Sequence, residues 1–243
     1  MNNGSNLAQD NRNTLNLHER STPPQIRGVI FDMDGVITDT IEYHYQTWQQ
    51  LADEEGIPFD RQANEALRGL SRRDSLLKML GSQQISEAKI EELLERKNNY
   101  YLDFIQMMTS EQLLPGFENL LNELRAAKIQ TGIASASQNV YRIVERLGIG
   151  DRIDVITNVY NVKRPKPAPD VFEHAAKELN LSPEECIVVE DAESGVAAAL
   201  AAGMWVVGLG PGDRVGKAHV ILPNLEGVHW QDLLNQLMKV TMG

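Results

Sequence analysis

Short apolar runs alternate with helical stretches along the second half of this 243-residue chain, and this alternation constrains the fold more than any other feature. It is typical of βα units, which build a parallel sheet covered by helices. The predicted strands span 129–134, 153–156, 186–189, 205–209 and 219–222. The predicted helices lie near 117–127, 140–147, 169–179 and 194–202. The fold class is therefore α/β, with a parallel-sheet core.

One further strand is predicted far upstream, over residues 26–31, where an apolar and partly β-branched segment runs directly into Asp32. Because such a strand must bury both of its faces, we expect it to join the later strands inside one sheet. Between them, apolar residues recur only at helical spacing. The sequence therefore predicts a discontinuous core, 26–40 and 112–243, and an α-helical cap domain, 41–111, inserted into it.

The amino-acid composition argues against several classes of binding partner and against secretion. The formal net charge of −11 argues against nucleic acid and anionic membranes, because both attract basic surfaces. The single cysteine, Cys186, excludes an intramolecular disulfide.

No stretch approaches the roughly 20 apolar residues of a membrane span. Residues 1–24 lack the apolar core of a secretory signal. Residues 1–25, rich in Asn, Ser and Gln, are expected to form a flexible tail. We therefore expect a cytoplasmic protein. We also expect a monomer, although composition does not bear on this.

Two carboxylates follow the first predicted strand directly, at Asp32 and Asp34. In open parallel sheets, ligands bind outside the carboxyl ends of the strands, so these side chains are expected to face a crevice. One carboxylate can act as a nucleophile or metal ligand while the other carries a proton. The alternative is a plain acidic turn after a strand.

A second acidic pair, Glu190 and Asp191, follows the strand predicted at 186–189. Hard cations such as Mg²⁺ take oxygen ligands, so carboxylates at two neighbouring strand ends are suited to hold one ion between them. The alternative for Asp191 is to cap the helix that begins near Glu193. Together with Asp32 and Asp34, the pair favours a metal site.

Two further segments are suited to bind an anion. The segment 135–137, Ser-Ala-Ser, offers hydroxyl and backbone N–H groups at the start of a helix, although simple capping would use the same residues. Lys166 lies between prolines that restrict the backbone around its positive charge. A rigidly held lysine suits a transferring phosphoryl group, whereas a basic loop that also contains Lys163 and Arg164 is usually just solvated.

These four segments, in this order, resemble the four signature motifs of the haloacid dehalogenase superfamily of phosphotransferases. The similarity extends into the predicted cap, where 40–44, 68–72 and 96–98 look like the β-phosphoglucomutase family. The similarity covers nearly the whole sequence from Arg27 to the C-terminus. One departure is Arg68, which stands where that pattern usually has Lys; an arginine is planar and forked, so sugar selectivity can differ.

The resemblance implies a Rossmann-like core with a four-helix cap. It also implies a Mg²⁺-dependent isomerase that interconverts β-glucose 1-phosphate and glucose 6-phosphate through β-glucose 1,6-bisphosphate. In that scheme Asp32 becomes an aspartyl phosphate and Asp34 is the general acid and base. Mg²⁺ is held by Asp32, the backbone carbonyl of Asp34 and Asp191, with Glu190 in support. The residues implied to bind substrate are Thr40, His44, Trp48, Arg68, Gly69, Arg72, Lys97, Ser135, Ala136, Ser137, Asn139 and Lys166.

Other functions stay open at this point, among them those of similar enzymes that act on other disaccharide-derived sugar phosphates. A small-molecule phosphatase of the same superfamily, in which water accepts the phosphoryl group, shares all the core motifs. Cap groups such as His44, Arg72 and Lys97 favour the mutase, because they would hold a bisphosphate at both ends. A non-catalytic sugar-phosphate sensor is disfavoured, because such a protein has no need of both Asp32 and Asp34.

Overall fold

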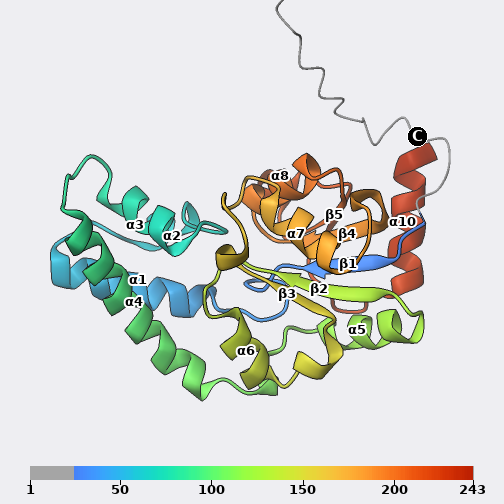
Figure 1. Cartoon of the computed structure of the whole chain (residues 1–243), viewed down its shortest axis with the longest axis horizontal. Coiled ribbons are helices and arrows are strands. Elements are labelled where there is room, and N and C mark those ends of the chain that lie inside the picture. Colours follow the sequence, from blue (N-terminus) through green and yellow to red (C-terminus); the bar gives the residue numbers. More distant parts are fainter. Residues whose placement is uncertain (1–24, 243) are drawn as a thin grey trace, which may run out of the picture.

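The computed structural model describes residues 25–242, and its core is one six-stranded parallel sheet (Figure 1). The strand order is β3-β2-β1-β4-β5-β6, which is a Rossmann-like order. The strands are β1 (Gly28–Phe31), β2 (Gln130–Ala134), β3 (Val155–Thr157), β4 (Cys186–Glu190), β5 (Trp205–Leu209) and β6 (Val220–Leu222). The predicted α/β fold class is confirmed. Apart from Gln25, the predicted tail lies outside the described residues.

The central strands form because their residues are apolar on both faces. Every residue of β1, β4 and β5 is buried, which matches the continuous apolar runs in the sequence. Along β1, Val29 and Phe31 belong to one hydrophobic cluster and Ile30 to the other. This alternation follows from the pleat of a strand, and it places one cluster on each face of the sheet.

Helices cover both faces of the sheet. On the face of Val29 lie α5 (Phe117–Ala126), α6 (Val140–Leu147) and α10 (Trp230–Met242). On the face of Ile30 lie α7 (Asp170–Glu178) and α8 (Glu193–Ala201), with the short α9 (Gly212–Val215) beside them. No helix among the described residues is both long and apolar enough to cross a membrane.

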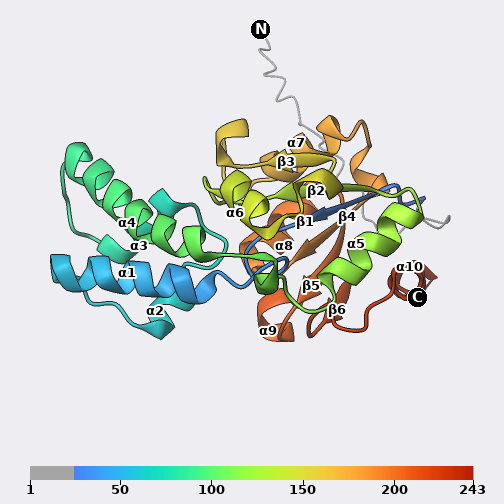
Figure 2. The same ribbon diagram turned by 90° about the horizontal axis from the view of Figure 1, so that it is seen from below.

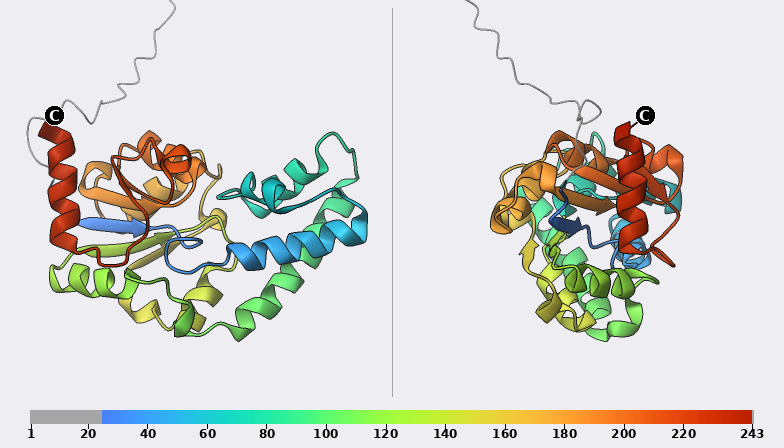
Figure 3. Two further views of the ribbon diagram at one scale, coloured as in Figure 1. Left: turned by 180° about the vertical axis from the view of Figure 1, so that it is seen from behind. Right: turned by 90° about the vertical axis from the view of Figure 1, so that its right-hand side faces the viewer.

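Four helices form a separate unit beyond the carboxyl ends of the strands, which we call the cap (Figures 2 and 3). They are α1 (Ile41–Glu55), α2 (Arg61–Glu65), α3 (Arg72–Leu80) and α4 (Glu87–Met107). The cap has its own hydrophobic cluster, which includes Trp48, Leu51, Leu76 and Leu93. Its helices start where the sequence supplies N-caps; Ser71, for example, accepts a hydrogen bond from the amide of Asp74. The exact boundaries between cap and core stay a prediction.

The two chain segments that connect the cap to the core lie side by side. Thr38, before the cap, forms a backbone bridge with Leu113, after it. The amide of Leu114 donates to the carbonyl of Ile37 at 2.8 Å, and the Thr38 hydroxyl donates to the carbonyl of Gln112 at 2.8 Å. The cap is therefore joined to the core through one paired connection.

Candidate active site

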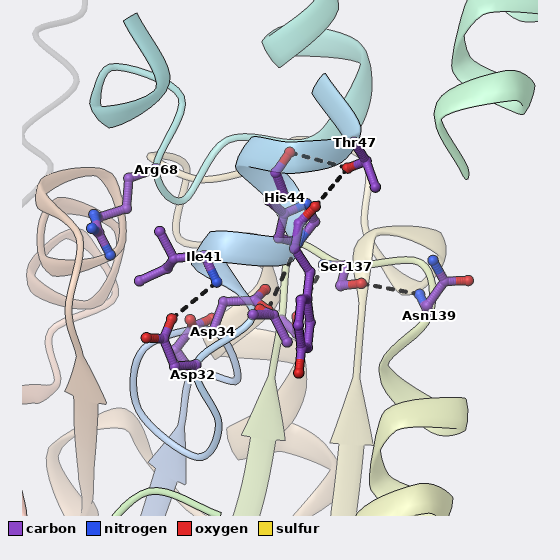
Figure 4. Close-up of polar contacts among 12 residues, drawn as sticks. Asp32, Asp34, Ile41, His44, Thr47, Arg68, Ser137 and Asn139 are labelled. Carbon is purple, nitrogen blue, oxygen red and sulfur yellow. Dashed lines mark hydrogen bonds and ion pairs between the residues drawn. The ribbon is translucent and has the colours of Figure 1, made fainter. Parts of the chain in front are cut away.

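A pocket lies between the carboxyl ends of the strands and the cap, and most of the predicted site residues line it. Figure 4 shows Asp32 and Asp34 at the end of β1, with His44 above them and Arg68 and Ser137 on opposite sides. The predicted residues that line the pocket are Asp32, Asp34, His44, Trp48, Arg68, Gly69, Arg72, Lys97, Ala136, Ser137, Asn139 and Asp191. Four others, Thr40, Ser135, Lys166 and Glu190, are buried behind its wall.

Lys166 is buried against the carboxylates of Asp32 and Glu190. Its ammonium lies 2.6 Å from Asp32 Oδ1 and 2.8 Å from Glu190 Oε1, and it also donates to the carbonyl of Ala134 at 3.2 Å. Burial alone would lower the pKa of Lys166, but the charges of Asp32 and Glu190 overcome this and raise it. Lys166 is therefore a fixed positive charge, and the solvated-loop alternative is wrong for this residue.

The carboxylates of Asp32, Glu190 and Asp191 converge at the ends of β1 and β4. One oxygen from each lies within 4.8 Å of the others, and all three side chains are buried. Burial, followed by the charge of Glu190, raises the pKa of Asp191 to about 8. The carboxylates of Glu190 and Asp32 both contribute to this shift, and the candidate ligands are all oxygens. The cluster therefore fits a divalent cation.

Neighbouring backbone holds this cluster in place. The amide of Ala192 donates to Glu190 Oε2 at 2.7 Å. A side-chain carbon at Gly195 would lie only 1.6 Å from Glu190 Oε1, so the carboxylate packs directly on the backbone of α8. The N-cap residue of α8 is Ala192. Asp191 therefore does not cap this helix, which was the alternative left open by the sequence.

Asp34 has surroundings unlike those of Asp32. The Thr40 hydroxyl donates a hydrogen bond to Asp34 Oδ1, and His44 Nε2 lies 3.8 Å from the same oxygen. Burial, followed by the charge of Asp32, raises the pKa of Asp34 to about 6. A carboxyl group with this pKa can both give and take a proton near neutral pH, as a general acid and base requires.

His44 is positioned by a buried lysine of the cap. Lys97 is 1% exposed, and its nitrogen lies 2.8 Å from His44 Nδ1. The same nitrogen lies over the rings of Trp48 and Tyr101, 5.0 and 4.5 Å from their centroids. The His44 ring in turn stacks on Tyr101. The cap therefore carries a rigid polar chain that ends at Asp34.

The loop after β2 forms the opposite wall of the pocket. Its turn is closed by hydroxyls, since Ser135 Oγ accepts from the amide of Ser137 at 2.9 Å and Ser137 Oγ accepts from the amide of Asn139 at 3.1 Å. The Asn139 side chain does not cap α6. Instead it donates to Asn98 Oδ1 of the cap at 2.9 Å. Ser135 thus shapes the loop, while Ser137 and Asn139 face the pocket.

Two arginines extend from the cap into the pocket and differ in their partners. Arg68 lies 2.7 Å from Asp191 and 3.1 Å from Glu65. Arg72 is half-buried and forms no ion pair with any residue of the 25–242 range. Burial lowers the pKa of its guanidinium. An unpaired, partly buried positive charge that faces a pocket is suited to bind an anion.

Comparison with known proteins adds to this geometry. The profile of the haloacid dehalogenase-like hydrolase family matches residues 26–203. The chain belongs to this family.

Individual members of the haloacid dehalogenase-like family are similar over most of their length. The β-phosphoglucomutase of Bacillus subtilis strain 168 is 42% identical over 201 residues, which is 81% of this chain and 89% of the relative. The fructose-1-phosphate phosphatase YqaB of Escherichia coli K12 is 30% identical over 183 residues, 74% of this chain and 94% of the relative. A crystal structure of β-phosphoglucomutase from Clostridium difficile has a TM-score of 0.86 at 37% identity, covering 90% of this chain and 100% of that one. The resemblance inferred from the motifs is confirmed.

The structure also adds pocket residues that the sequence analysis did not select. These are Ile41, Asn64, Leu67, Leu70, Ser75 and Gln138. Gln138 lies between two selected residues, Leu67 directly precedes the cap motif that begins at Arg68, and Leu70 lies inside that motif, so closeness in the sequence was the available signal. Asn64 is a polar residue that is buried in the cap, and only the folded structure reveals that burial.

Proposed function

We propose that this protein is a β-phosphoglucomutase, an isomerase that interconverts β-D-glucose 1-phosphate and D-glucose 6-phosphate. One observation carries the proposal: Asp32 and Asp191 line the core side of the pocket, with Lys166 buried against Asp32, and Arg72, which forms no ion pair among the described residues, lines its cap side. A substrate with phosphates at both ends would be matched at both. The similarity to the β-phosphoglucomutases of Bacillus subtilis and Clostridium difficile supports the same reaction.

The proposed chemistry uses two carboxylates in separate roles. An oxygen of Asp32 attacks the phosphorus of β-glucose 1,6-bisphosphate, the bond from phosphorus to the sugar oxygen breaks, and Asp34 gives its proton to that oxygen. In the second half-reaction, Asp34 takes the proton of a sugar hydroxyl as that hydroxyl attacks the aspartyl phosphate. The pKa of about 6 at Asp34 supports both directions. Lys166 stabilises the charge on the transferring phosphoryl oxygens.

We assign the divalent cation of this reaction as Mg²⁺. The carboxylates of Asp32 and Asp191 and the backbone carbonyl of Asp34 would hold it, with Glu190 in support. When bound, it would offset the negative charge that gathers on the phosphoryl oxygens. The all-oxygen composition of the acidic cluster supports this choice.

The remaining assignments concern the two ends of the substrate. Ser135, Ala136 and Lys166 would hold the transferring phosphate, and Arg72, Ser137 and Asn139 the distal one. His44 and Lys97, with Thr40 and Trp48, would align Asp34, while Arg68 and Gly69 would contact the sugar from the cap. A monomeric state and a cytoplasmic location stay predictions.

The second candidate is a sugar-phosphate phosphatase, which the likeness to fructose-1-phosphate phosphatase favours. The contact of Asp34 with His44 favours the mutase, because it ties the proton carrier to the cap, and Thr40, just before the first cap helix, donates a hydrogen bond to the same carboxylate. A proton carrier placed only when the cap is closed would protect the aspartyl phosphate from water until a sugar hydroxyl arrives.

A coupled assay tests the choice between these candidates. β-Glucose 1-phosphate is offered with a trace of β-glucose 1,6-bisphosphate, and glucose 6-phosphate and inorganic phosphate are followed in parallel. We expect the isomer in large excess. Phosphate release that equals or exceeds isomer formation, across several sugar phosphates, would replace the mutase by the phosphatase.

Two variants test the role of Arg72 in this assay. Arg72→Met should reduce isomer formation strongly, since it removes the positive charge that lines the cap side of the pocket. Arg73→Met is the matched control, because the side chain of the neighbouring Arg73 is 41% exposed and is paired with Glu87 and Glu91. It should leave isomer formation unchanged.

A further inference from the structure

The guanidinium of Arg68 forms an ion pair with Asp191, one of the three carboxylates of the acidic cluster formed by Asp32, Glu190 and Asp191. Its Nη1 lies 2.7 Å from Asp191 Oδ2. The pair is well shielded from water, because the two side chains are 14% and 5% exposed. Asp191 is also one of the three residues whose oxygens lie within 4.8 Å of one another. The guanidinium therefore binds one of the groups that would hold the divalent cation.

This contact joins the cap to the core. Arg68 belongs to the cap loop between α2 and α3, and its other hydrogen bonds go to Glu65 in α2. Asp191 follows β4 in the core. In Figure 4 the Arg68 side chain extends from the cap loop toward the core. Within the described residues, Arg68 and Asp191 also line both the substrate pocket and the cavity next to it. The pair therefore lies on the boundary between the two cavities.

Charge balance indicates that the guanidinium and a divalent cation compete. The carboxylates of Asp32, Glu190 and Asp191 carry three negative charges when ionised, and Lys166 supplies one positive charge, which leaves two negative charges. One divalent cation neutralises these without Arg68. If Arg68 kept its ion pair with Asp191 while the cation was bound, the guanidinium and the cation would lie on either side of one carboxylate. Two positive charges would then repel each other in a site shielded from water.

We propose that Arg68 is a positioning residue of the cap that competes with the divalent cation for Asp191, so that cation binding releases this contact between cap and core. The inference rests on the metal site of the proposed function. If Arg68 occupies Asp191 for part of the time, the apparent affinity for the cation is proportional to the fraction of molecules in which Asp191 is free. By linkage, the cation weakens the Arg68 contact to the same extent.

The first test is a titration with Mn²⁺, in which free Mn²⁺ is followed by electron paramagnetic resonance. Arg68→Met should bind Mn²⁺ about tenfold or more tightly than the wild type, because Asp191 is then free. Arg214→Met is the matched control: Arg214 lines the neighbouring cavity with Asp191 but forms no ion pair with it among the described residues. Its loss removes the same charge without vacating Asp191, so the gain should be less than about threefold.

Amide hydrogen exchange of residues 66–71 is the second test. Mn²⁺ should accelerate exchange of this loop in the wild type, a result that needs no variant to fold. In Arg68→Met the exchange should already be fast and should not respond to Mn²⁺. A purely structural role for Arg68 would not make loop exchange depend on the cation.

The outcomes distinguish failure of competition by Arg68 from failure of the metal site on which it rests. If the wild type binds no Mn²⁺, the proposed metal site falls and the inference falls with it. If the wild type and Arg68→Met bind Mn²⁺ equally, or Arg214→Met gains as much affinity as Arg68→Met, the metal site stands and competition by Arg68 is overturned. Loop exchange in the wild type that does not change with Mn²⁺ also overturns the release of the contact.

Discussion

A side-chain carbon at Gly69 would lie 2.5 Å from Oγ of Ser194 and 2.8 Å from Cβ of Ala192. The cap loop and the first turn of α8 therefore meet at a distance that only a glycine allows. The backbone at Gly69 also has a φ of +73°, which other residues rarely adopt. The close approach of the cap loop to the core therefore depends on Gly69 for two independent reasons.

Gly69→Ala should lower kcat/KM for the proposed mutase reaction about tenfold or more, because the added methyl group keeps the cap loop away from the core. The matched control is Gly81→Ala. Gly81 also lies in the cap at positive φ, but nothing lies within 4 Å of its added carbon. Both variants should lose about 1 kcal/mol of unfolding free energy to backbone strain. Equal losses of kcat/KM would show that strain alone, not contact with the core, limits activity.

His44 should remain neutral across physiological pH. Burial, followed by the charge of Lys97, lowers its pKa well below 6.5, and the contact with Lys97 at Nδ1 leaves the ring proton on Nε2. Nitrogen NMR of the imidazole rings should show no titration of His44 between about pH 5.5 and 8. His229 is the internal control: it is exposed, and its hydrogen bond to Glu123 raises its pKa above 6.5. Titration of His44 near pH 6.5 would contradict the assignment.

The same shift predicts a pH dependence of stability. Below about pH 6.5 the unfolded chain takes up a proton at His44 that the folded chain does not, so this residue lowers the unfolding free energy as pH falls. His44→Gln should therefore flatten the decrease in unfolding free energy between about pH 6.5 and 5. Chemical denaturation of both proteins at several pH values measures it, and an unchanged slope would count against a buried, neutral His44.

Lys97→Met should separate function from stability. Without the lysine nothing fixes the proton of His44 on Nε2, and alignment of Asp34 is lost, so kcat should fall about a hundredfold. The unfolding free energy should stay the same or rise, because a buried charge is removed. Lys89→Met, on the surface of the same helix, should change neither. A fall in stability large enough to explain the loss of kcat would contradict the functional role.

Asp32→Asn should lose more than about a thousandfold in kcat, because an amide cannot act as the anionic nucleophile. The fold should survive, since Lys166 keeps its ion pair with Glu190. Phosphoenzyme formation, followed by intact-protein mass after mixing with bisphosphate, should disappear. Asp39→Asn is the control from the same segment, because Asp39 is exposed and an amide oxygen can still accept from the amide of Ile41. A phosphoenzyme in Asp32→Asn would move the nucleophile elsewhere.

Chelation of divalent cations should stop turnover and leave the protein folded, because Arg68 and Lys166 still balance much of the buried negative charge. Circular dichroism and activity, measured on the same samples, check this. Asp191→Asn should raise the Mg²⁺ concentration for half-maximal activity about tenfold or more. Glu193→Gln, exposed two residues further along, should leave it unchanged. An unaltered Mg²⁺ requirement in Asp191→Asn would remove this residue from the metal site.

The strands were predictable because their burial on both faces requires continuous apolar runs. The run 205–209 coincides with β5, and 186–189 is one residue shorter than β4. The prediction 153–156 starts two residues before β3. The reason is Ile153, which is apolar because it packs against the core from the end of a short turn, not because it pairs with a neighbouring strand.

Contacts between cap and core were not predictable from the sequence. Arg68 and Asp191 are separated by 123 positions, and Asn98 and Asn139 by 41. Their pairing depends on the angle at which one packed unit lies over the other, which no local pattern encodes. The carboxylates after β1 and β4 were predictable, because adjacent parallel strands bring their ends together whatever the cap does.

The bridge between Thr38 and Leu113 has an evolutionary consequence. Since the chain leaves the sheet and returns to it at nearly the same point, the intervening stretch can be exchanged for another helical module without altering the strand order or the position of Asp32. A single contiguous gene segment can then change which molecule is admitted and how Asp34 is aligned, while Asp32, Lys166, Glu190 and Asp191 keep their places in the core. Recombination at the paired connection is therefore a direct route to new substrates on this scaffold.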